Sequence, residues 1–557
     1  MTPLKNKSIL YIFGILIALI LVNYLSSIFH SRWDLTKDKR YTLSDTSKAL
    51  VADLEAPLII DVFLEGDLPK EFKLLQAQTK DFIEEFQSVS NKISVNYIDP
   101  IEDEDTRERN INQLTGAGLK PYINTDNSDG KITQNLIFPW AFASYNDKTV
   151  KIPLLKRSIT KPLAEQIDNS IEVLEYAFAD GFNTLIKPKS KSIAVLRGNG
   201  QLQDVYLTDV LKTLRPYYNI APFTLDSVDT NLEGTLKRLS AFDLIINAKP
   251  TEPFSEKEKL VLDQFTINGG KSLWLTEAVF MDKDSLYNDK GSTVATIKDL
   301  NLNDFFFKYG ARINPALVKD LYSAPIMLAF GEGSSAQLQP VRWQYSPLAA
   351  TNASHPITKN LGFVRCDFAS PIDTLKNNIS KTILLQSSEQ SKIEGVPKTI
   401  ALSSITEELD ESSFNAGSQV LGVLLEGTFT SVYENRILPY KLPEFKTKGK
   451  SSKIVLISDG DVIKNDVLKN RPQELGFDPI SGETFANKEF LLNAVNYMLD
   501  DSGLINIRGK EIDIAYLDPE KIKTKKVSWQ LLNIVLPLVI LTVFGMVFNY
   551  LRRRANT

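Results

Sequence analysis

The sequence predicts an α/β protein that is held in a membrane by one helix at each end. Two observations predict this fold class. Residues 8–29 and 527–551 are apolar runs without a charge, and each exceeds the roughly 20 residues that a helix needs to cross a bilayer. Between the runs, short apolar strands alternate with amphipathic helical stretches, which is the pattern of a sheet covered by helices.

The first apolar run has one alternative interpretation, a cleaved signal peptide, because Lys5 and Lys7 precede it. The run is longer than the apolar region of most signals and offers no convincing small-residue cleavage site, so a retained transmembrane helix is favoured. Pro537 lies inside the second run, and helices in lipid tolerate proline. The sequence therefore predicts two membrane spans.

Two spans place both termini on the same side of the membrane. Basic residues flank both ends of each run, and long loops cross membranes largely regardless of charge, so charge alone orients the chain weakly. The terminal clusters, Lys5 with Lys7 and 552–554, contain no acidic residue. We expect both termini in the cytoplasm and the body of the chain outside it.

The composition excludes several functional classes. The chain has 64 basic and 68 acidic residues, and without Lys5, Lys7 and the three terminal arginines 59 basic residues remain. A body with this acidic excess lacks the basic face that nucleic acids require. The single cysteine, Cys366, excludes an internal disulfide, and only two histidines, His30 and His355, are present. These counts remove most zinc sites and histidine-dependent catalytic triads.

Residues 31–188 are predicted to form an N-terminal α/β domain. A strand at 58–64, a helix and a strand at 93–98 have the spacing of a parallel β-α-β unit, here of a thioredoxin-like kind. Extended runs at 136–145 and 149–155 flank a turn and predict a hairpin.

A long helix that begins at Pro162 is predicted to close this domain. Its apolar residues recur at helical spacing and mark one buried face. They are Leu163, Ile167, Ile171, Leu174, Phe178 and Leu185. Packing in the core or between domains is favoured over packing on a partner protein's helix.

Residues 189–510 are predicted to form a second α/β domain. Its strands alternate with helices, which indicates a doubly wound sheet with helices on both faces. The predicted strands are 192–196, 220–225, 244–247, 272–275 and 453–457. Residues 283–449 are richer in short strands and form an elaboration of this domain, and residues 511–526 link the body to the second span.

Two glycine-rich stretches imitate nucleotide-binding motifs. Gly269-Gly270-Lys271-Ser272 resembles the end of a P-loop, but Phe265 occupies the position of the required first glycine and a helix precedes the stretch. A helix C-cap explains it better. In Gly198-Asn199-Gly200 the third glycine of a dinucleotide fingerprint is replaced by Gln203, so a tight turn is favoured.

Three carboxylates are predicted at the carboxyl ends of strands, where α/β proteins place their sites. Asp459 and Asp461 follow the strand 453–457, and Glu277 follows the strand 272–275. A phosphatase of the Asp-x-Asp type begins in this way but needs downstream partners for which little chain remains. A solvated turn is favoured for each, with a weak cation site as the alternative.

The remaining reactive residues form no catalytic set. Cys366 has no nucleophile elbow and no nearby histidine in sequence, so we interpret it as a small buried hydrophobic residue. His355 lies in a turn. The sequence thus predicts no catalytic, cofactor-binding or metal-binding residue.

Taken together, these segments resemble the GldG family, the auxiliary membrane component of an ABC-type system tied to bacterial gliding motility. The segments that carry the resemblance are 33–64, 93–100, 192–201, 248–277, 355–358, 421–431, 453–466 and 487–510. The resemblance implies an inner-membrane protein with an extracytoplasmic, periplasmic body that works with a permease and a separate ATPase. It also implies that the second domain is similar to class I glutamine amidotransferases, although the nucleophile elbow is absent.

The resulting hypothesis is a non-enzymatic component of an ABC-type complex required for gliding motility, which acts by binding and conformational coupling. Two other hypotheses compete with it. One is a membrane-tethered solute-binding protein of an ABC importer with a cleft between its domains. The other is an unusual hydrolase that uses Asp459, Asp461 or Glu277.

Overall fold

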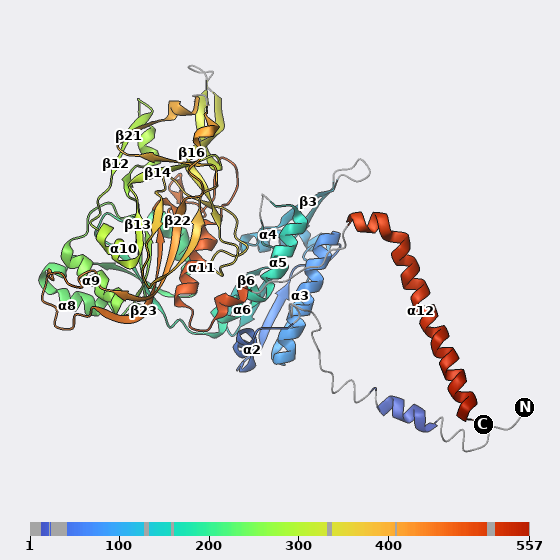
Figure 1. Ribbon diagram of the computed structural model, residues 1–557. Helices are drawn as coiled ribbons and strands as arrows, with labels where there is room; N and C mark the ends of the chain where they lie inside the picture. The colour runs from blue at the N-terminus through green and yellow to red at the C-terminus, as the bar shows by residue number, and fades with distance from the viewer. Residues whose placement is uncertain are drawn as a thin grey trace, which may run out of the picture. The chain divides into compact units, whose positions relative to one another are not determined.

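The computed structural model divides the chain into two units, residues 1–510 and residues 511–557 (Figure 1). Each unit is described by itself. The described residues are 13–21, 23, 42–126, 133–157, 161–330, 337–406, 409–509 and 519–555.

The N-terminal part of the first unit contains a four-stranded sheet of order β2-β1-β5-β6. Strand β1 (Leu58–Val62) pairs in parallel with β2 (Ile93–Tyr97), and α3 (Lys70–Val89) connects them. On its other side β1 pairs antiparallel with β5 (Trp140–Tyr145), which forms a hairpin with β6 (Lys148–Pro153). The predicted β-α-β unit and the predicted hairpin are both confirmed, but the extended run predicted at 136–145 is divided, because β4 (Thr133–Ile137) ends before β5 begins.

Two consecutive helices follow the hairpin where the sequence predicts one. Helix α5 (Leu163–Glu172) and helix α6 (Leu174–Ile186) are separated at Val173, whose φ of −103° and ψ of 6° are not helical. The single long helix is thus corrected to two. The predicted buried face is confirmed, since Phe178 is fully buried and the rings of Phe86 and Phe182 lie 5.1 Å apart.

The other elements of this part complete its surroundings. They are α2 (Asp45–Ala52), α4 (Glu104–Gly116), β3 (Tyr122–Asp126) and β4 (Thr133–Ile137).

The second part of the unit is built on a larger sheet whose parallel half has the order β8-β7-β9-β10-β23. Apolar residues dominate the central strands, which are fully buried over β9, as expected for a parallel sheet covered on both faces. Its strands are β7 (Ser192–Arg197), β8 (Asn219–Thr224), β9 (Leu244–Ala248), β10 (Lys271–Leu275) and β23 (Lys448–Ile457). All five predicted strands are present and parallel.

Helices cover both faces of this sheet, so the predicted doubly wound arrangement is confirmed. Helices α7 (Asp204–Leu214) and α11 (Asn487–Leu499) pack on the face that includes Ile193. Helices α8 (Val228–Leu239) and α9 (Glu256–Ile267) pack on the opposite face.

Helix α9 has clear boundary signals. It begins with a capping box between Ser255 and Glu258. Beyond its end, Gly269 has a φ of 98° and the N–H of Gly270 donates to the carbonyl of Phe265. The predicted helix C-cap is confirmed at the stretch that imitates a P-loop.

The predicted strand-rich elaboration partly extends the same sheet. Strands β22 (Val420–Thr430), β19 (Ser380–Gln386), β16 (Gln337–Thr351) and β15 (Ser323–Phe330) continue it from β23, each antiparallel to its neighbour. A smaller core around the fully buried Trp343 supports the outer strands.

Short elements complete this part. The strands are β11 (Val279–Phe280), β12 (Ser292–Ile297), β13 (Ala311–Ile313), β14 (Ala316–Asp320), β17 (Val364–Arg365), β18 (Ile372–Thr374), β20 (Ser391–Gly395), β21 (Lys398–Ala401), β24 (Val467–Leu468) and β25 (Arg471–Pro472). The helices are α10 (Asn303–Tyr309) and the 3-10 turns η2 (Lys283–Leu286), η4 (Leu402–Thr406), η5 (Glu411–Ser413), η6 (Asp461–Ile463) and η7 (Leu504–Gly509).

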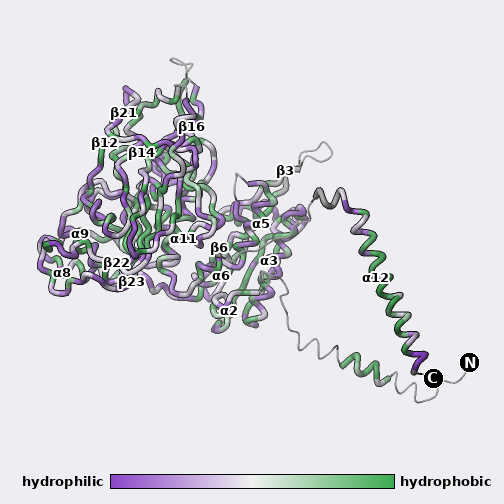
Figure 2. Tube along the Cα trace, in the orientation of Figure 1, coloured by the Kyte–Doolittle hydropathy of each residue, from purple (hydrophilic) through white to green (hydrophobic). Residues whose placement is uncertain are grey.

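The second unit contains one long helix, α12 (Pro519–Ala555). Within it, Thr524–Arg554 is the one stretch in the described part of the chain that is long and apolar enough to cross a membrane. Figure 2 shows hydrophobic residues along most of α12. The helix starts before residue 527, so the last part of the predicted linker is helical. Of the predicted first span, residues 13–21 and 23 are helical and exposed, and the rest lies outside the described residues.

Candidate functional site

The three carboxylates that the sequence places at strand ends lie together in the structure. Strands β10 and β23 are parallel neighbours, so the residues that follow them meet at one edge of the sheet. Oxygen atoms of Glu277, Asp459 and Asp461 all lie within 4.8 Å of one another. Asp459 is fully buried and Glu277 is 3% exposed. The predicted solvated turns are therefore wrong, because the side chain of Asp461 is also only 12% exposed.

Lys249 places its ammonium group against two of these carboxylates, those of Asp461 and Glu277. Its Nζ lies 2.7 Å from both carboxylate oxygens of Asp461 and 3.2 Å from Oε1 of Glu277. A second ammonium, from Lys298, lies 2.5 Å from Oε2 of Glu277. Burial opposes the charge on Lys249, but the surrounding carboxylates outweigh it and raise its pKa above the ordinary value.

Both carboxylate oxygens of Asp459 accept hydrogen bonds from backbone N–H groups. Its Oδ1 accepts the N–H of Asp461 and its Oδ2 accepts the N–H of Asp367, both at 2.7 Å. Burial, followed by the charges of Asp461 and Glu277, raises the pKa of Asp459 well above its usual range. The carboxyl group thus ties the end of β23 to the neighbouring 367 segment.

The other candidate nucleophile and base are not arranged for catalysis. Cys366 is fully buried, as predicted, and burial, with Asp459 nearby, raises the pKa of its thiol well above the usual value. The ring of His355 packs on Tyr497 with centroids 4.8 Å apart. Burial lowers the pKa of His355 to about 4, so this histidine is neutral at physiological pH.

The chemistry of this sheet edge is that of a closed ion-pair network. A divalent cation bound by Glu277, Asp459 and Asp461 would have to displace Lys249, whose ammonium already contacts Glu277 and Asp461. We refer to these four residues as the Lys249 network. A polar cavity of about 340 Å³ adjoins it, and Asp461 lies in the cavity wall.

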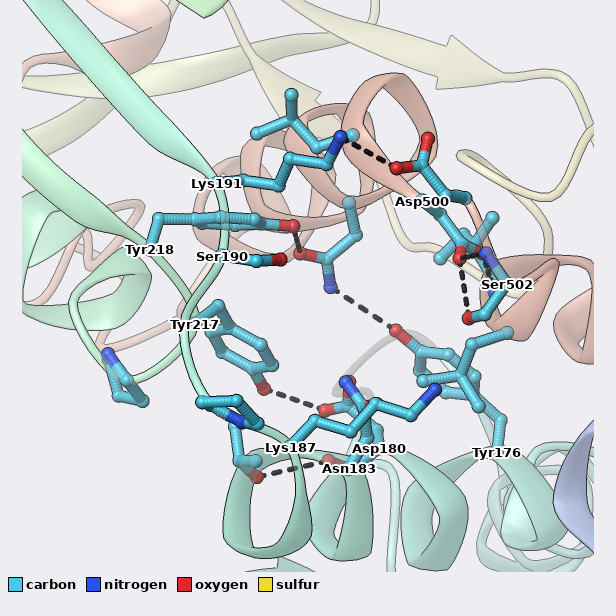
Figure 3. A pocket seen from close by; sticks show the side chains of 18 residues that line it. Tyr176, Asp180, Asn183, Lys187, Ser190, Lys191, Tyr217, Tyr218, Asp500 and Ser502 are labelled. Carbon is cyan, nitrogen blue, oxygen red and sulfur yellow. Dashed lines mark hydrogen bonds and ion pairs between the residues drawn. The ribbon is translucent and has the colours of Figure 1, made fainter. Parts of the chain in front are cut away.

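A second group of polar residues lies between α6 and the larger sheet region (Figure 3). It surrounds a cavity of about 190 Å³. Tyr217 donates a hydrogen bond of 2.6 Å to Asp180, Tyr218 donates one of 2.8 Å to Asn496, and Asn496 donates one of 3.4 Å to Tyr176. Burial raises the pKa of Asp180 to about 6, although Tyr217 and Arg508 oppose the shift.

Ion pairs centred on the partly exposed Glu489 connect the same two regions next to this cavity. The Lys156 ammonium donates to Glu489 at 2.7 Å, and Arg508 lies 3.5 Å from the same carboxylate. Arg508 also donates to the carbonyls of Pro356 and Lys359. Burial lowers the pKa of Lys156 to about 8, and the two cations outweigh burial to lower the pKa of Glu489.

Sequence reasoning missed this interface cluster. Lys156 and Glu489 are 333 positions apart, and no spacing rule pairs residues over such a distance. The available signal was indirect: Lys156 directly follows the extended run predicted at 149–155, and Glu489 lies in 487–510, one of the segments that carry the family resemblance.

The class of protein follows from comparison with known families. A family described as "ABC-type uncharacterized transport system" matches residues 190–494, which is more than half of the chain. The chain belongs to this family. A second family, a domain of unknown function (DUF7088), matches residues 37–144.

Individual relatives give the extent of the similarity. An uncharacterized protein of Borreliella burgdorferi is 22% identical over 548 residues and covers 94% of each chain. A solved structure, the mmIFT52 N-terminal domain, is 12% identical and aligns over 56% of this chain and 99% of its own length. Its TM-score of 0.30 is too low to establish a shared fold.

Proposed function

We propose that this chain is a non-enzymatic auxiliary component of an ABC-type transport complex, and that it acts by binding and conformational coupling to a permease and a separate ATPase. The observation that carries the proposal is the family match over residues 190–494. That range contains the whole parallel half of the larger sheet and the Lys249 network.

The geometry of the sheet edge supports a non-enzymatic role. Catalytic carboxylates act on bound groups within hydrogen-bonding distance. Here Asp461 and Glu277 are matched by lysines, and Asp459 accepts two backbone N–H groups. The competing hypothesis of a hydrolase would require these contacts to be broken before a substrate could approach.

The proposed topology has two spans, with both termini cytoplasmic and the body outside the inner membrane, in the periplasm. Helix α12 supports the second span, and the uncharged run of residues 8–29 supports the first. A body held at both ends receives movement from membrane-embedded partners through two connections. A receptor that only captured a solute would need one anchor.

The finer assignment is to a GldG-type component of gliding motility, in contact with other gliding machinery. Its support is the order of the matching segments from residue 33 to residue 510. In this assignment residues 31–188 are a thioredoxin-like domain, and the order β2-β1-β5-β6 is consistent with it. Residues 189–510 are an amidotransferase-like domain that has lost its nucleophile.

Co-purification tests the proposal directly. The tagged full-length chain is extracted from its native membrane with a mild detergent, and the associated proteins are identified by mass spectrometry. An ABC permease and an ABC ATPase are expected in amounts comparable to the chain. Their absence from every gentle extraction would contradict the proposal, and normal gliding in a deletion strain would contradict the motility assignment.

A further inference from the structure

Cavities run along the interface between the N-terminal region and the larger sheet region. Three of them, of about 190, 650 and 550 Å³, are neighbours. The first and second share Tyr176, Asp180 and Tyr217 among their lining residues. The second and third share Lys156, Arg157 and Glu489. The middle cavity therefore has the ion pairs of the interface at one end and the Asp180–Tyr217 pair at the other.

The middle cavity has the size and the walls of a small-molecule site. Sites of this kind occupy roughly 300–1,000 Å³ and are mainly apolar with a few converging polar groups. Its apolar walls come from three directions: the segment after β6, the helices α5 and α6, and helix α11. The apolar residues from these directions are Leu154, Leu155, Val173, Ala177 and Leu492, and Val150, Pro153 and Pro216 also line the cavity.

The charges around the middle cavity favour an anion. Four basic side chains line it against two carboxylates: Lys151, Lys156, Arg157 and Arg508 against Asp180 and Glu489. The single carboxylate of Glu489 pairs with both Lys156 and Arg508. The positive charges at this end of the middle cavity therefore outnumber the negative ones.

Lys156 and Arg157 have donor capacity to spare. Within the described part of the chain, the Lys156 ammonium donates one hydrogen bond, to Glu489, although an ammonium has three donors. The Arg157 guanidinium donates to the carbonyl of Lys120 at 2.8 Å through one nitrogen and has four further N–H donors. With a pKa of about 8, Lys156 carries its charge at neutral pH.

We propose that the middle cavity binds a small amphipathic carboxylate, with the carboxylate at Lys156 and Arg157 and the apolar body along the wall formed by Val173, Ala177 and Leu492. Such a ligand contacts both regions at once, so its binding stabilises their relative position. This gives the body a means of sensing a solute. The inference goes beyond the proposed function and rests on the cavity alone, so it holds whether or not an ABC partner is found.

The test uses the full-length chain in lipid nanodiscs, without partners, and two probes with the same apolar body. These are 2-naphthoate, which is an anion, and 2-naphthalenemethanol, which is neutral. Isothermal titration calorimetry, with empty nanodiscs as the blank, is expected to show one molecule of 2-naphthoate bound per chain, at least tenfold more tightly than the alcohol. Absence of saturable 2-naphthoate binding, or equal affinity for both probes, would overturn the inference.

Variants assign any binding to this cavity. Arg157→Gln and Lys156→Gln are expected to weaken 2-naphthoate binding at least tenfold and to leave the alcohol unaffected. Ala177→Leu adds side-chain volume to the apolar wall and narrows the cavity, so it is expected to weaken the binding of both probes. Lys187→Gln is the matched control and is expected to leave the binding of both probes unchanged. Lys187 lines the cavity of about 190 Å³ and not the middle cavity.

The thermal unfolding midpoint of each variant shows whether it is folded. Arg157 is exposed and carries the test alone if Lys156→Gln does not fold. Unchanged 2-naphthoate affinity in folded Arg157→Gln and Ala177→Leu would place the probe elsewhere and refute the site.

Discussion

At the scale of single residues, two backbone features put Lys249 at the centre of its network. Lys249 has a φ of 52°, in the left-handed region that few non-glycine residues adopt. Gly460 lies directly against it: a Cβ added there would lie 2.3 Å from Cγ of Lys249. The chain therefore accepts local strain and requires a glycine to bring one ammonium to the carboxylates.

The sequence could predict the three carboxylates but not their counter-ion. Glu277, Asp459 and Asp461 each follow an apolar strand, so their place at the sheet edge was predictable. Lys249 also follows a strand, β9, but its contact with Asp461 spans 212 positions. Only the order of the strands brings these ends together, and that order depends on long-range pairing.

Replacement of Lys249 by asparagine is predicted to destabilise the chain and to create a cation site. Asparagine tolerates a positive φ, so the loss is mainly that of the ammonium. Breaking a buried ion pair costs about 3–5 kcal/mol. In thermal unfolding of the solubilised chain, Ca²⁺ or Mg²⁺ is expected to raise the midpoint of Lys249→Asn and not that of the wild type.

Lys464→Ala is the matched control for this prediction. Lys464 also approaches Asp461, at 3.8 Å, but its side chain is 20% exposed and is not central to the network. Its loss is expected to cost less than that of Lys249 and to create no cation response. Equal stability of Lys249→Asn and the wild type would contradict the prediction.

Asp180 is predicted to give stability a pH dependence between about pH 4 and pH 6. Its pKa is about 6 in the folded chain against an ordinary 3.8, so the folded state binds the proton more tightly. The stabilising contribution is complete below the unfolded pKa and is lost as the pH rises to 6. Denaturant unfolding of Asp180→Asn over this range is expected to lack that loss.

Asp501→Asn provides a comparison of opposite sign. The hydrogen bond from Lys191 lowers the pKa of Asp501, so its contribution is lost as the pH falls. If Asp180→Asn and the wild type show the same pH profile, Asp180 does not titrate as described.

At the scale of elements, helix α11 joins the two regions of the first unit. It packs in the core of the larger sheet through Phe490 and Leu491 and presents Glu489 to Lys156 and Arg508. The alternation of strands and helices in the sequence predicted helices that cover both faces of this sheet. It could not predict that Glu489, in the first turn of the helix, forms ion pairs with Lys156 and Arg508, because those contacts depend on distant parts of the chain.

Removal of Glu489 is predicted to loosen the interface. Glu489→Ala leaves the cations of Lys156 and Arg508 without their shared carboxylate. Because the Glu489 side chain is 38% exposed, the expected cost is about 1–3 kcal/mol. Hydrogen exchange is expected to increase in α6 (Leu174–Ile186) and α11 (Asn487–Leu499) more than in α9 (Glu256–Ile267), which lies on the opposite face of the sheet. An equal change in hydrogen exchange in all three helices, relative to the wild type, would contradict the prediction.

The correction of one predicted helix to two has a physical cause. Helices α5 and α6 continue one apolar periodicity across Val173, so periodicity alone could not reveal the break in backbone geometry there.

The strands of 283–449 were predicted as an elaboration of the second domain, but their short apolar runs could not show which strands pair. Pairing between β22 and β23 joins them to the parallel sheet.

At the scale of the whole molecule, the two units differ in how they meet their surroundings. Residues 1–510 are a compact unit with buried cores, whereas the described side chains of α12 are exposed along its length, including its apolar ones. An apolar helix of 31 residues without protein cover is suited to lipid. The sequence predicted this span directly, because the signal is local and needs no long-range contact.

Cysteine labelling is predicted to show on which side of the membrane the body and the two termini lie. Cys366 is fully buried, so it should stay silent when new cysteines replace Lys7, Lys290 and Thr557 in separate variants. In intact spheroplasts a membrane-impermeant maleimide is expected to label the Lys290→Cys chain alone, and lysis is expected to expose the other two. Labelling of either terminus before lysis would contradict the topology.

Lys249 has a consequence for the environment in which the body can work. If a calcium or magnesium ion joined the carboxylates at this sheet edge, the edge would lose its cross-link wherever chelators are abundant or divalent salts are scarce. The ammonium of Lys249 is covalently part of the chain, and neither dilution nor a chelator can extract it. The end of this sheet therefore keeps its shape independently of the mineral content of its surroundings.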